Sequence, residues 1–177
     1  MAVLVEATSV IVRIDSVLKS VPGGWDGYER LVTNSTLCAD EEIARVGFMS
    51  PVDVEAFISK LTRLGLEFLR DGVAIDVAIA DQIHGLNSAC SWLQFGRVPT
   101  GDAGARVAAC RLTGSKSKVL VTPLDWKFDN SLSSKYAFVP NEHVHKGMQF
   151  LRHENGLDIY HNPLTGKEAF VGRTGET

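Results

Sequence analysis

Residues 50–81 constrain the fold of this chain more than any other stretch, because nearly every position there carries a local structural signal. Ser50 has a side chain suited to capping the free amide of Asp53, and Pro51 follows at the first helical position. Five apolar residues then recur at helical spacing: Val54, Phe57, Ile58, Leu61 and Leu64. Gly65 stands where a left-handed C-terminal cap belongs. The sequence therefore predicts an amphipathic helix that needs an apolar surface to pack against.

Two strands are predicted after this helix, over residues 66–69 and 73–80, joined by a turn at residues 70–72. The second strand alternates large apolar residues with small ones, so one of its faces suits the close approach of another layer. Asp76 lies on the small face. We interpret it as the exposed margin of that face, with a functional carboxylate as the alternative.

The C-terminal half is predicted to have short strands separated by turn-rich segments, at residues 92–98, 106–113, 119–122, 126–128 and 136–139. Its clearest part is a three-stranded meander, with strands at 148–153, 157–161 and 169–172 and an Asn155-Gly156 turn between the first two. The fold class is therefore α+β: a mixed helix–strand N-terminal half with a central amphipathic helix, followed by an antiparallel all-β C-terminal half. We expect a single domain over residues 1–177, and a division into an α+β sub-lobe at residues 1–86 and an all-β sub-lobe at 87–177 is the alternative left open.

Composition argues for an ordinary globular protein, with 45% hydrophobic and 22% charged residues. No apolar run has membrane-spanning length, and the N-terminus lacks the pattern of a signal peptide. Cys38, Cys90 and Cys110 are odd in number and widely spaced, which fits buried thiols in a reducing compartment. We therefore expect a cytoplasmic protein. Neither a phosphate-binding loop nor a dinucleotide fingerprint occurs, and no cofactor is expected.

Charge is unevenly distributed along the chain. Residues 1–80 carry 7 Lys/Arg against 12 Asp/Glu, a balance of −5, and residues 81–177 carry 11 against 9, a balance of +2; together they give the net −3 of the whole chain. An acidic half favours a basic protein partner and disfavours nucleic acid. Four residues are the candidate members of such a binding face: Glu41, Glu42, Asp53 and Glu55.

Asp81 and His84 are the first candidates for catalysis. They are three residues apart, just after a predicted buried strand, where a turn can hold a carboxylate against an imidazole. Cys90 follows closely and is the candidate nucleophile, with His84 as its base. The alternative interpretation is a loop capped by its own aspartate.

His143 and His145 form a His-x-His pair beside Glu142. In an extended segment both imidazoles project to one side, so they are candidate ligands of a divalent metal. No further ligand occurs at a characteristic spacing, and exposed loop histidines are the alternative.

Four segments are similar in sequence to known proteins: Asp81-Gln82, 90–96, 150–154 and 157–173. In these segments the chain resembles a family of uncharacterised bacterial proteins. This resemblance implies a bacterial cytoplasmic origin and attaches no activity, cofactor or catalytic residue.

Taken together, these patterns favour a non-enzymatic protein that binds or regulates a partner protein, for example a toxin-neutralising immunity protein. The alternative is a small hydrolase or metal-dependent enzyme that uses the His84/Cys90 loop or the His143/His145 segment. A membrane partner is not expected, nucleic acid is disfavoured, and short strand edges leave a homodimer open.

Overall fold

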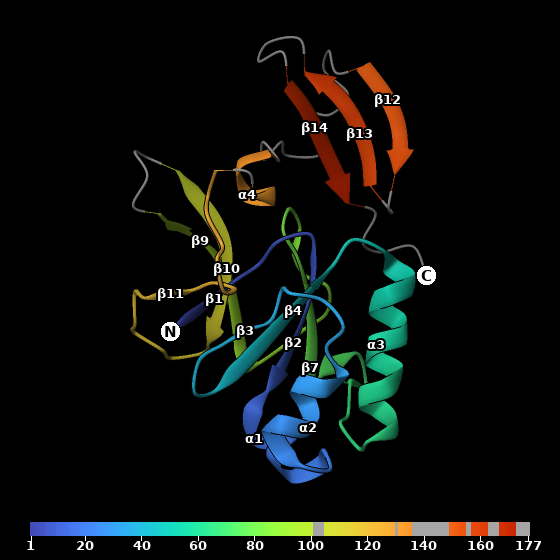
Figure 1. Ribbon diagram of the computed structural model, residues 1–177, viewed down its shortest axis with the longest axis vertical. Helices are drawn as coiled ribbons and strands as arrows, with labels where there is room; N and C mark the ends of the chain where they lie inside the picture. The colour runs from blue at the N-terminus through green and yellow to red at the C-terminus, as the bar shows by residue number, and fades with distance from the viewer. Residues whose placement is uncertain (101–104, 130, 136–148, 155–156, 163–166, 173–177) are drawn as a thin grey trace.

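The computed structural model describes residues 1–100, 105–129, 131–135, 149–154, 157–162 and 167–172 (Figure 1). Its body has two stacked β-sheets, and three helices pack on the free face of one of them. The central sheet has the strand order β3-β4-β2-β7-β8 and is antiparallel throughout. Its strands are β3 (Cys38–Ala39), β4 (Ile43–Phe48), β2 (Thr8–Arg13), β7 (Val77–Asp81) and β8 (Gly85–Leu86). The helices are α1 (Ile14–Ser20), α2 (Gly24–Leu31) and α3 (Pro51–Arg63).

A second, outer sheet has the order β11-β1-β10-β9. Its strands are β11 (Leu120–Val121), β1 (Ala2–Leu4), β10 (Arg106–Leu112) and β9 (Leu93–Pro99). Strand β1 runs parallel to β11 and antiparallel to β10. Because β1 comes from the N-terminus and its partners come from residues 106–121, the outer sheet joins the two halves of the chain.

The remaining elements are smaller. Strands β5 (Leu69–Arg70) and β6 (Val73–Ala74) form a hairpin, and α4 (Leu132–Lys135) is a single turn of helix. The C-terminal sheet is an antiparallel meander of β12 (Gln149–Glu154), β13 (Leu157–Asn162) and β14 (Lys167–Gly172). This arrangement confirms the predicted α+β class and the predicted meander.

Alternation along the central strands divides the interior into two cores. Val10 and Val12 of β2 face the helices, where they pack with the buried side of α3, whereas Ile11 faces the outer sheet. Ala78 and Ala80 of β7 belong to the core between the sheets. The small face predicted for this strand therefore does receive another layer, and its small side chains let the sheets approach closely.

Helix α3 ends as its sequence predicts. Gly65 has φ +101°, the Leu66 amide donates to the Leu61 carbonyl at 3.1 Å, and the Gly65 amide donates to Thr62 at 3.0 Å. This is the Schellman pattern, and Leu66 is buried beneath it. The N-terminal cap differs in one detail, because the Ser50 hydroxyl accepts from the amide of Val52 at 3.2 Å and not from that of Asp53.

Four strand predictions need correction or fall outside the described residues. The strand predicted over residues 66–69 is reduced to β5, because residues 66–68 are irregular. The predicted strand 73–80 is broken, because residues 73–74 pair with β5 while β7 begins at Val77. Asp76 lies at the break, where its carboxylate accepts from the Ser16 hydroxyl at 2.7 Å and the Glu67 amide at 2.8 Å. Residues 126–128 form no strand, and the prediction for residues 136–139 lies outside the described ranges.

Candidate functional site

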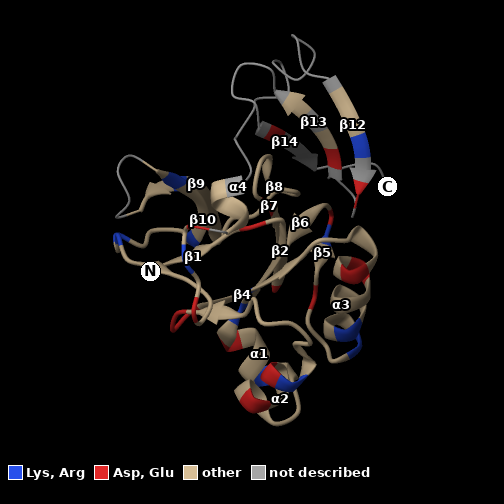
Figure 2. Cartoon of the chain, turned by 45° about the horizontal axis from the view of Figure 1, so that its top comes forward, with Lys and Arg blue, Asp and Glu red and all other residues tan. Residues whose placement is uncertain are grey.

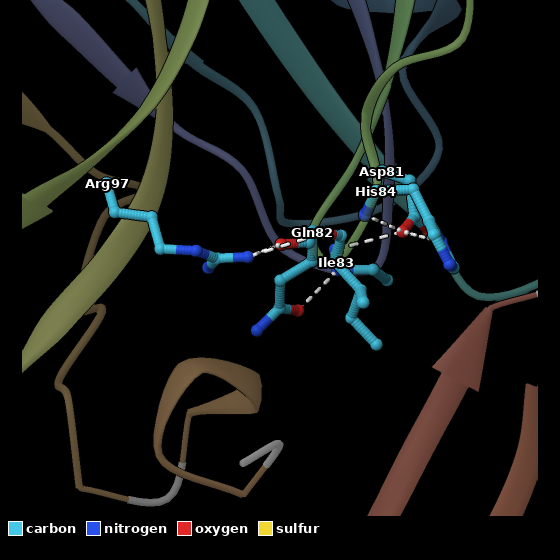
Figure 3. Close-up of polar contacts among 6 residues, drawn as sticks. Asp81, Gln82, Ile83, His84 and Arg97 are labelled. Carbon is cyan, nitrogen blue, oxygen red and sulfur yellow. Dashed lines mark hydrogen bonds and ion pairs between the residues drawn. The ribbon is translucent and has the colours of Figure 1, made fainter. Parts of the chain in front are cut away.

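The Asp81–His84 turn connects β7 to β8 at the end of the central sheet, and we take it as the candidate site (Figure 3). Asp81 is 3% exposed. One of its oxygens, Oδ1, accepts from the amides of Ile83 and His84, each at 2.9 Å, and lies 3.1 Å from His84 Nδ1. The predicted carboxylate–imidazole pair is therefore present in the structure.

This pair has a definite chemical capacity. When the ring proton is on Nδ1, Nδ1 donates a hydrogen bond to Asp81 Oδ1, and Nε2 is then the basic nitrogen of the ring. The His84 side chain is 29% exposed. An imidazole held in this way can act as a general base toward water or a hydroxyl group. The same carboxylate oxygen also closes the turn through two backbone amides, so it has a structural role as well.

Contacts from two other parts of the chain hold the turn in place. Gln82 and Ala7 exchange bonds, since the Ala7 amide donates to Gln82 Oε1 and the Gln82 amide donates to the Ala7 carbonyl, both at 2.9 Å. Arg97 of β9 donates to the Gln82 carbonyl at 3.0 Å and to that of Ile83 at 3.4 Å. Arg97 and His84 lie on opposite sides of the turn in Figure 3, so the guanidinium does not face the ring.

Burial has one clear electrostatic effect at this site. It lowers the pKa of the Arg97 guanidinium, and the charge of Asp81 offsets this partly. Gly85 ends the turn at φ +83°, and a Cβ there would come within 3.0 Å of the Phe95 ring. A side chain at this position would therefore strain the backbone and require the Phe95 ring to shift.

Cys90 is not brought to His84. It follows Ala89, whose carbonyl accepts from Ala74 at 2.8 Å, near the beginning of the β6–β7 segment, whereas His84 lies beyond its end. Burial raises the pKa of the Cys90 thiol, and backbone hydrogen bonds from Trp92 and Leu93 together with the charge of Arg13 offset this only partly. An activated cysteine needs a lowered pKa and an adjacent base. The described geometry supplies neither for Cys90.

The four candidate acidic residues are all exposed, but they fall into two groups. Glu41 and Glu42 lie in the turn before β4, while Asp53 and Glu55 lie in the first turns of α3, which follows β4. The length of β4 separates the two groups, and Figure 2 shows acidic residues both beside β4 and on α3. The structure therefore has two acidic surfaces where the sequence suggested one face.

The group on α3 adjoins exposed apolar side chains. Val52 is 72% exposed and Met49 is 38% exposed. We define the α3 patch as Met49, Val52, Asp53 and Glu55. No Lys or Arg occurs between Arg45 and Lys60, and Arg45 is 2% exposed, so no basic side chain from this segment neutralises the patch.

The predicted metal ligands His143 and His145 lie outside the described residues. Within the described ranges, no group of three or more His, Cys, Asp or Glu side chains is arranged to hold a metal ion. No helix in that part of the chain combines the length and apolar character needed to cross a membrane.

Sequence reasoning missed a buried polar network around Arg45. The guanidinium donates to the Ser9 hydroxyl at 2.8 Å, to the Glu6 carbonyl at 2.7 Å and to the Thr36 carbonyl at 3.1 Å. Burial lowers the pKa of Arg45. The one signal in the sequence was a charged residue inside the otherwise apolar strand β4.

Comparisons with protein-family models, with curated proteins and with solved structures gave no match for this chain.

Proposed function

We propose that this protein acts by binding a partner protein through the α3 patch. The observation that carries the proposal is the 72% exposure of Val52 next to the carboxylates of Asp53 and Glu55. An apolar residue bordered by charges is the arrangement that protein interfaces use, with an apolar centre and a polar rim.

The chemistry of the α3 patch indicates what kind of partner surface would bind it. Two carboxylates without a neighbouring cation in the same segment favour a surface that bears Lys or Arg, and this complementarity raises the association rate and rejects acidic competitors. Val52 and Met49 would pack into a shallow apolar depression on the partner, between its Lys or Arg residues. A toxin-neutralising immunity protein is one concrete form of such a binder, because an acidic surface attracts a basic one electrostatically.

A site-specific crosslinking experiment tests this proposal. A photoreactive amino acid replaces Val52 in the full chain, and the same amino acid replaces Leu18 of α1, which is 58% exposed, as a control. We expect one adduct of defined mass from position 52 and none of that mass from position 18. The same adduct from both positions would contradict a specific patch.

Charge reversal provides the matched comparison. Asp53→Lys/Glu55→Lys and Glu41→Lys/Glu42→Lys change the net charge equally but at different surfaces. We expect the first pair to reduce the position-52 adduct about tenfold or more, equivalent to the loss of roughly 1.4 kcal/mol of binding free energy, and the second to leave it nearly unchanged. If both pairs of substitutions reduced the adduct equally, partner binding would depend on the net charge of the protein and not on the α3 patch.

A second candidate function rests on a different observation, the 3.1 Å contact between Asp81 and His84. In this reading the protein is a small hydrolase in which His84 Nε2 takes a proton from a water molecule as that water attacks an ester or amide carbonyl. We expect His84→Gln to lower turnover of a responsive ester by about 10²–10⁴-fold without changing the melting temperature. A panel of esters that shows no turnover above the His84→Gln background would exclude this candidate. The metal-dependent form of this alternative, through His143 and His145, is tested by elemental analysis of protein purified without a tag.

A further inference from the structure

Glu6 connects the body of the protein to the segment that follows β11. Its residue is 8% exposed, and its Oε1 accepts three hydrogen bonds. The donors are the Trp126 indole at 3.2 Å, the Ser133 amide at 2.9 Å and the Ser133 hydroxyl at 2.7 Å. We call residues 123–129 and 131–135, which include α4, the strap. One carboxylate oxygen thus receives all three of these donors from the strap.

Few other described polar contacts join the strap to the body. Its described backbone hydrogen bonds are internal, such as Trp126 to Pro123 at 3.1 Å and Ser131 to Phe128 at 3.0 Å. Among the described residues one further bond joins the two, from Gln82 Nε2 to the Leu132 carbonyl, and at 3.4 Å it is long for an N–H···O bond. Within the described ranges the strap pairs with no strand. Its attachment therefore depends mainly on Glu6 and on apolar contact.

The strap lies on the side of the outer sheet that faces away from the central sheet. Val3 and Val5 belong to the core between the sheets, so Leu4 and Glu6 point to the opposite side. On that side Leu4 is 0% exposed and Ala109, its partner in β10, is 3% exposed. Since Glu6 binds the strap on this side, the strap helps to cover these apolar residues, and Figure 1 shows α4 beside β10.

The main chain of Glu6 is held much more firmly than the strap. Its carbonyl accepts from Arg45 at 2.7 Å and from the Ser9 hydroxyl at 3.1 Å, and both donors are buried in the body. Neighbouring Ala7 is fixed by its exchange of bonds with Gln82. The carboxylate is consequently presented at a fixed place, and local opening would separate the strap from it.

We propose that Glu6 is the latch of a strap that opens as a unit while the two-sheet body stays folded. Opening breaks the three bonds to Oε1, hydrates the carboxylate and uncovers the apolar face around Leu4 and Ala109. Segments with few backbone bonds to the body open at lower free energy than core strands, and the charge of Glu6 sets how often this one opens.

Hydrogen exchange of the full chain, followed by mass spectrometry, tests the latch. In Glu6→Gln the acceptor becomes neutral and its bonds weaken. We therefore expect the amides of residues 126–129 and 131–134 to exchange about tenfold faster, with β2 and β4 unchanged. Glu67→Gln is the matched control, because Glu67 pairs with exposed Arg70 and is remote from the strap in the described contacts. It should leave the strap unaffected.

Two results would overturn the proposal. One is unchanged exchange of residues 126–129 and 131–134 in folded Glu6→Gln. The other is equal acceleration in the strap, β2 and β4, which would mean global destabilisation. If Glu6→Gln does not fold, Ser133→Ala tests the proposal instead, because it removes one hydrogen-bond donor from the strap and leaves the body intact. We expect Ser133→Ala to accelerate exchange in the strap alone, and no acceleration there would refute the latch.

Discussion

Gly47→Ala is expected to destabilise this protein, although Gly→Ala in a strand ordinarily does the reverse. Gly47 lies in β4, two residues after Arg45 and therefore on the same face, and the Arg45 guanidinium lies over it. A Cβ at Gly47 would lie 2.8 Å from Arg45 Cζ and closer still to Nη2. A flexible arginine would move aside, but this one is bound to Ser9, Glu6 and Thr36.

The magnitude follows from the contacts that must yield. Overpacking a close-packed interior costs about 1–3 kcal/mol. Displacing the guanidinium from one of its acceptors adds about 1.5–3 kcal/mol, because the donor is charged. The lower backbone entropy of alanine in the unfolded chain returns about 0.4–1 kcal/mol. The free energy of unfolding should therefore fall by about 2–5 kcal/mol, which for a chain of this length lowers the melting temperature by about 5–15 °C.

Urea denaturation of four variants measures this effect. Gly96→Ala is the control, because Gly96 lies in β9 with nothing within 4 Å of its Cβ position, and this variant should be neutral or slightly stabilised. In an Arg45→Met background the Gly47→Ala penalty should shrink to below about 1 kcal/mol, which reveals the coupling in a double-mutant cycle. A neutral Gly47→Ala variant, or a penalty of the same size without the guanidinium, would refute the reasoning.

The other predictions concern a cap, a pH response and thiol reactivity. Ser50→Ala removes the bond to the Val52 amide and should lower the free energy of unfolding by about 1 kcal/mol, measured by urea denaturation. Burial raises the pKa of the Cys110 thiol, so above about pH 8.5 the unfolded chain releases a proton that the folded chain keeps. The contribution of this group to the free energy of unfolding should therefore be present in full below that pH and decline above it, by up to about 1.4 kcal/mol per pH unit. Cys110→Ala should make the free energy of unfolding depend less steeply on pH, as measured by denaturation curves taken from pH 7 to 10. With iodoacetamide at pH 8, Cys90 should react first but more slowly than a free thiol, and Cys38 and Cys110 should react only on unfolding; peptide mass spectrometry that finds Cys38 labelled early would contradict this.

The two candidate functions, partner binding at the α3 patch and hydrolysis at the Asp81–His84 turn, depend on different residues. Binding at the patch needs exposed carboxylates and tolerates changes at His84. Hydrolysis needs the imidazole and tolerates charge reversal at Asp53 and Glu55. Because the two sites lie in different elements, each set of variants serves as a control for the other.

Sequence alone determined the features that depend on neighbouring residues. The cap at Ser50, the apolar face of α3 and the left-handed Gly65 follow from local chemistry, as does the antiparallel pairing of β12 with β13. The Asp81–His84 pair was predictable for the same reason, since a three-residue separation in a turn brings the two groups within bonding distance.

Tertiary structure alone decided which distant groups meet. Cys90 is six residues from His84 in sequence, yet the path of the chain through β8 carries it away to the level of Ala74. Conversely, Glu6 reaches Ser133 across 127 positions, and Arg45 reaches Glu6 across 39. A buried guanidinium or carboxylate must find acceptors or donors wherever the fold presents them, because leaving it unpaired costs more than local preference can return. Local sequence patterns do not indicate those partners. The Glu6 latch and the Arg45 network could therefore be identified only from the tertiary structure, in which the two sheets stack.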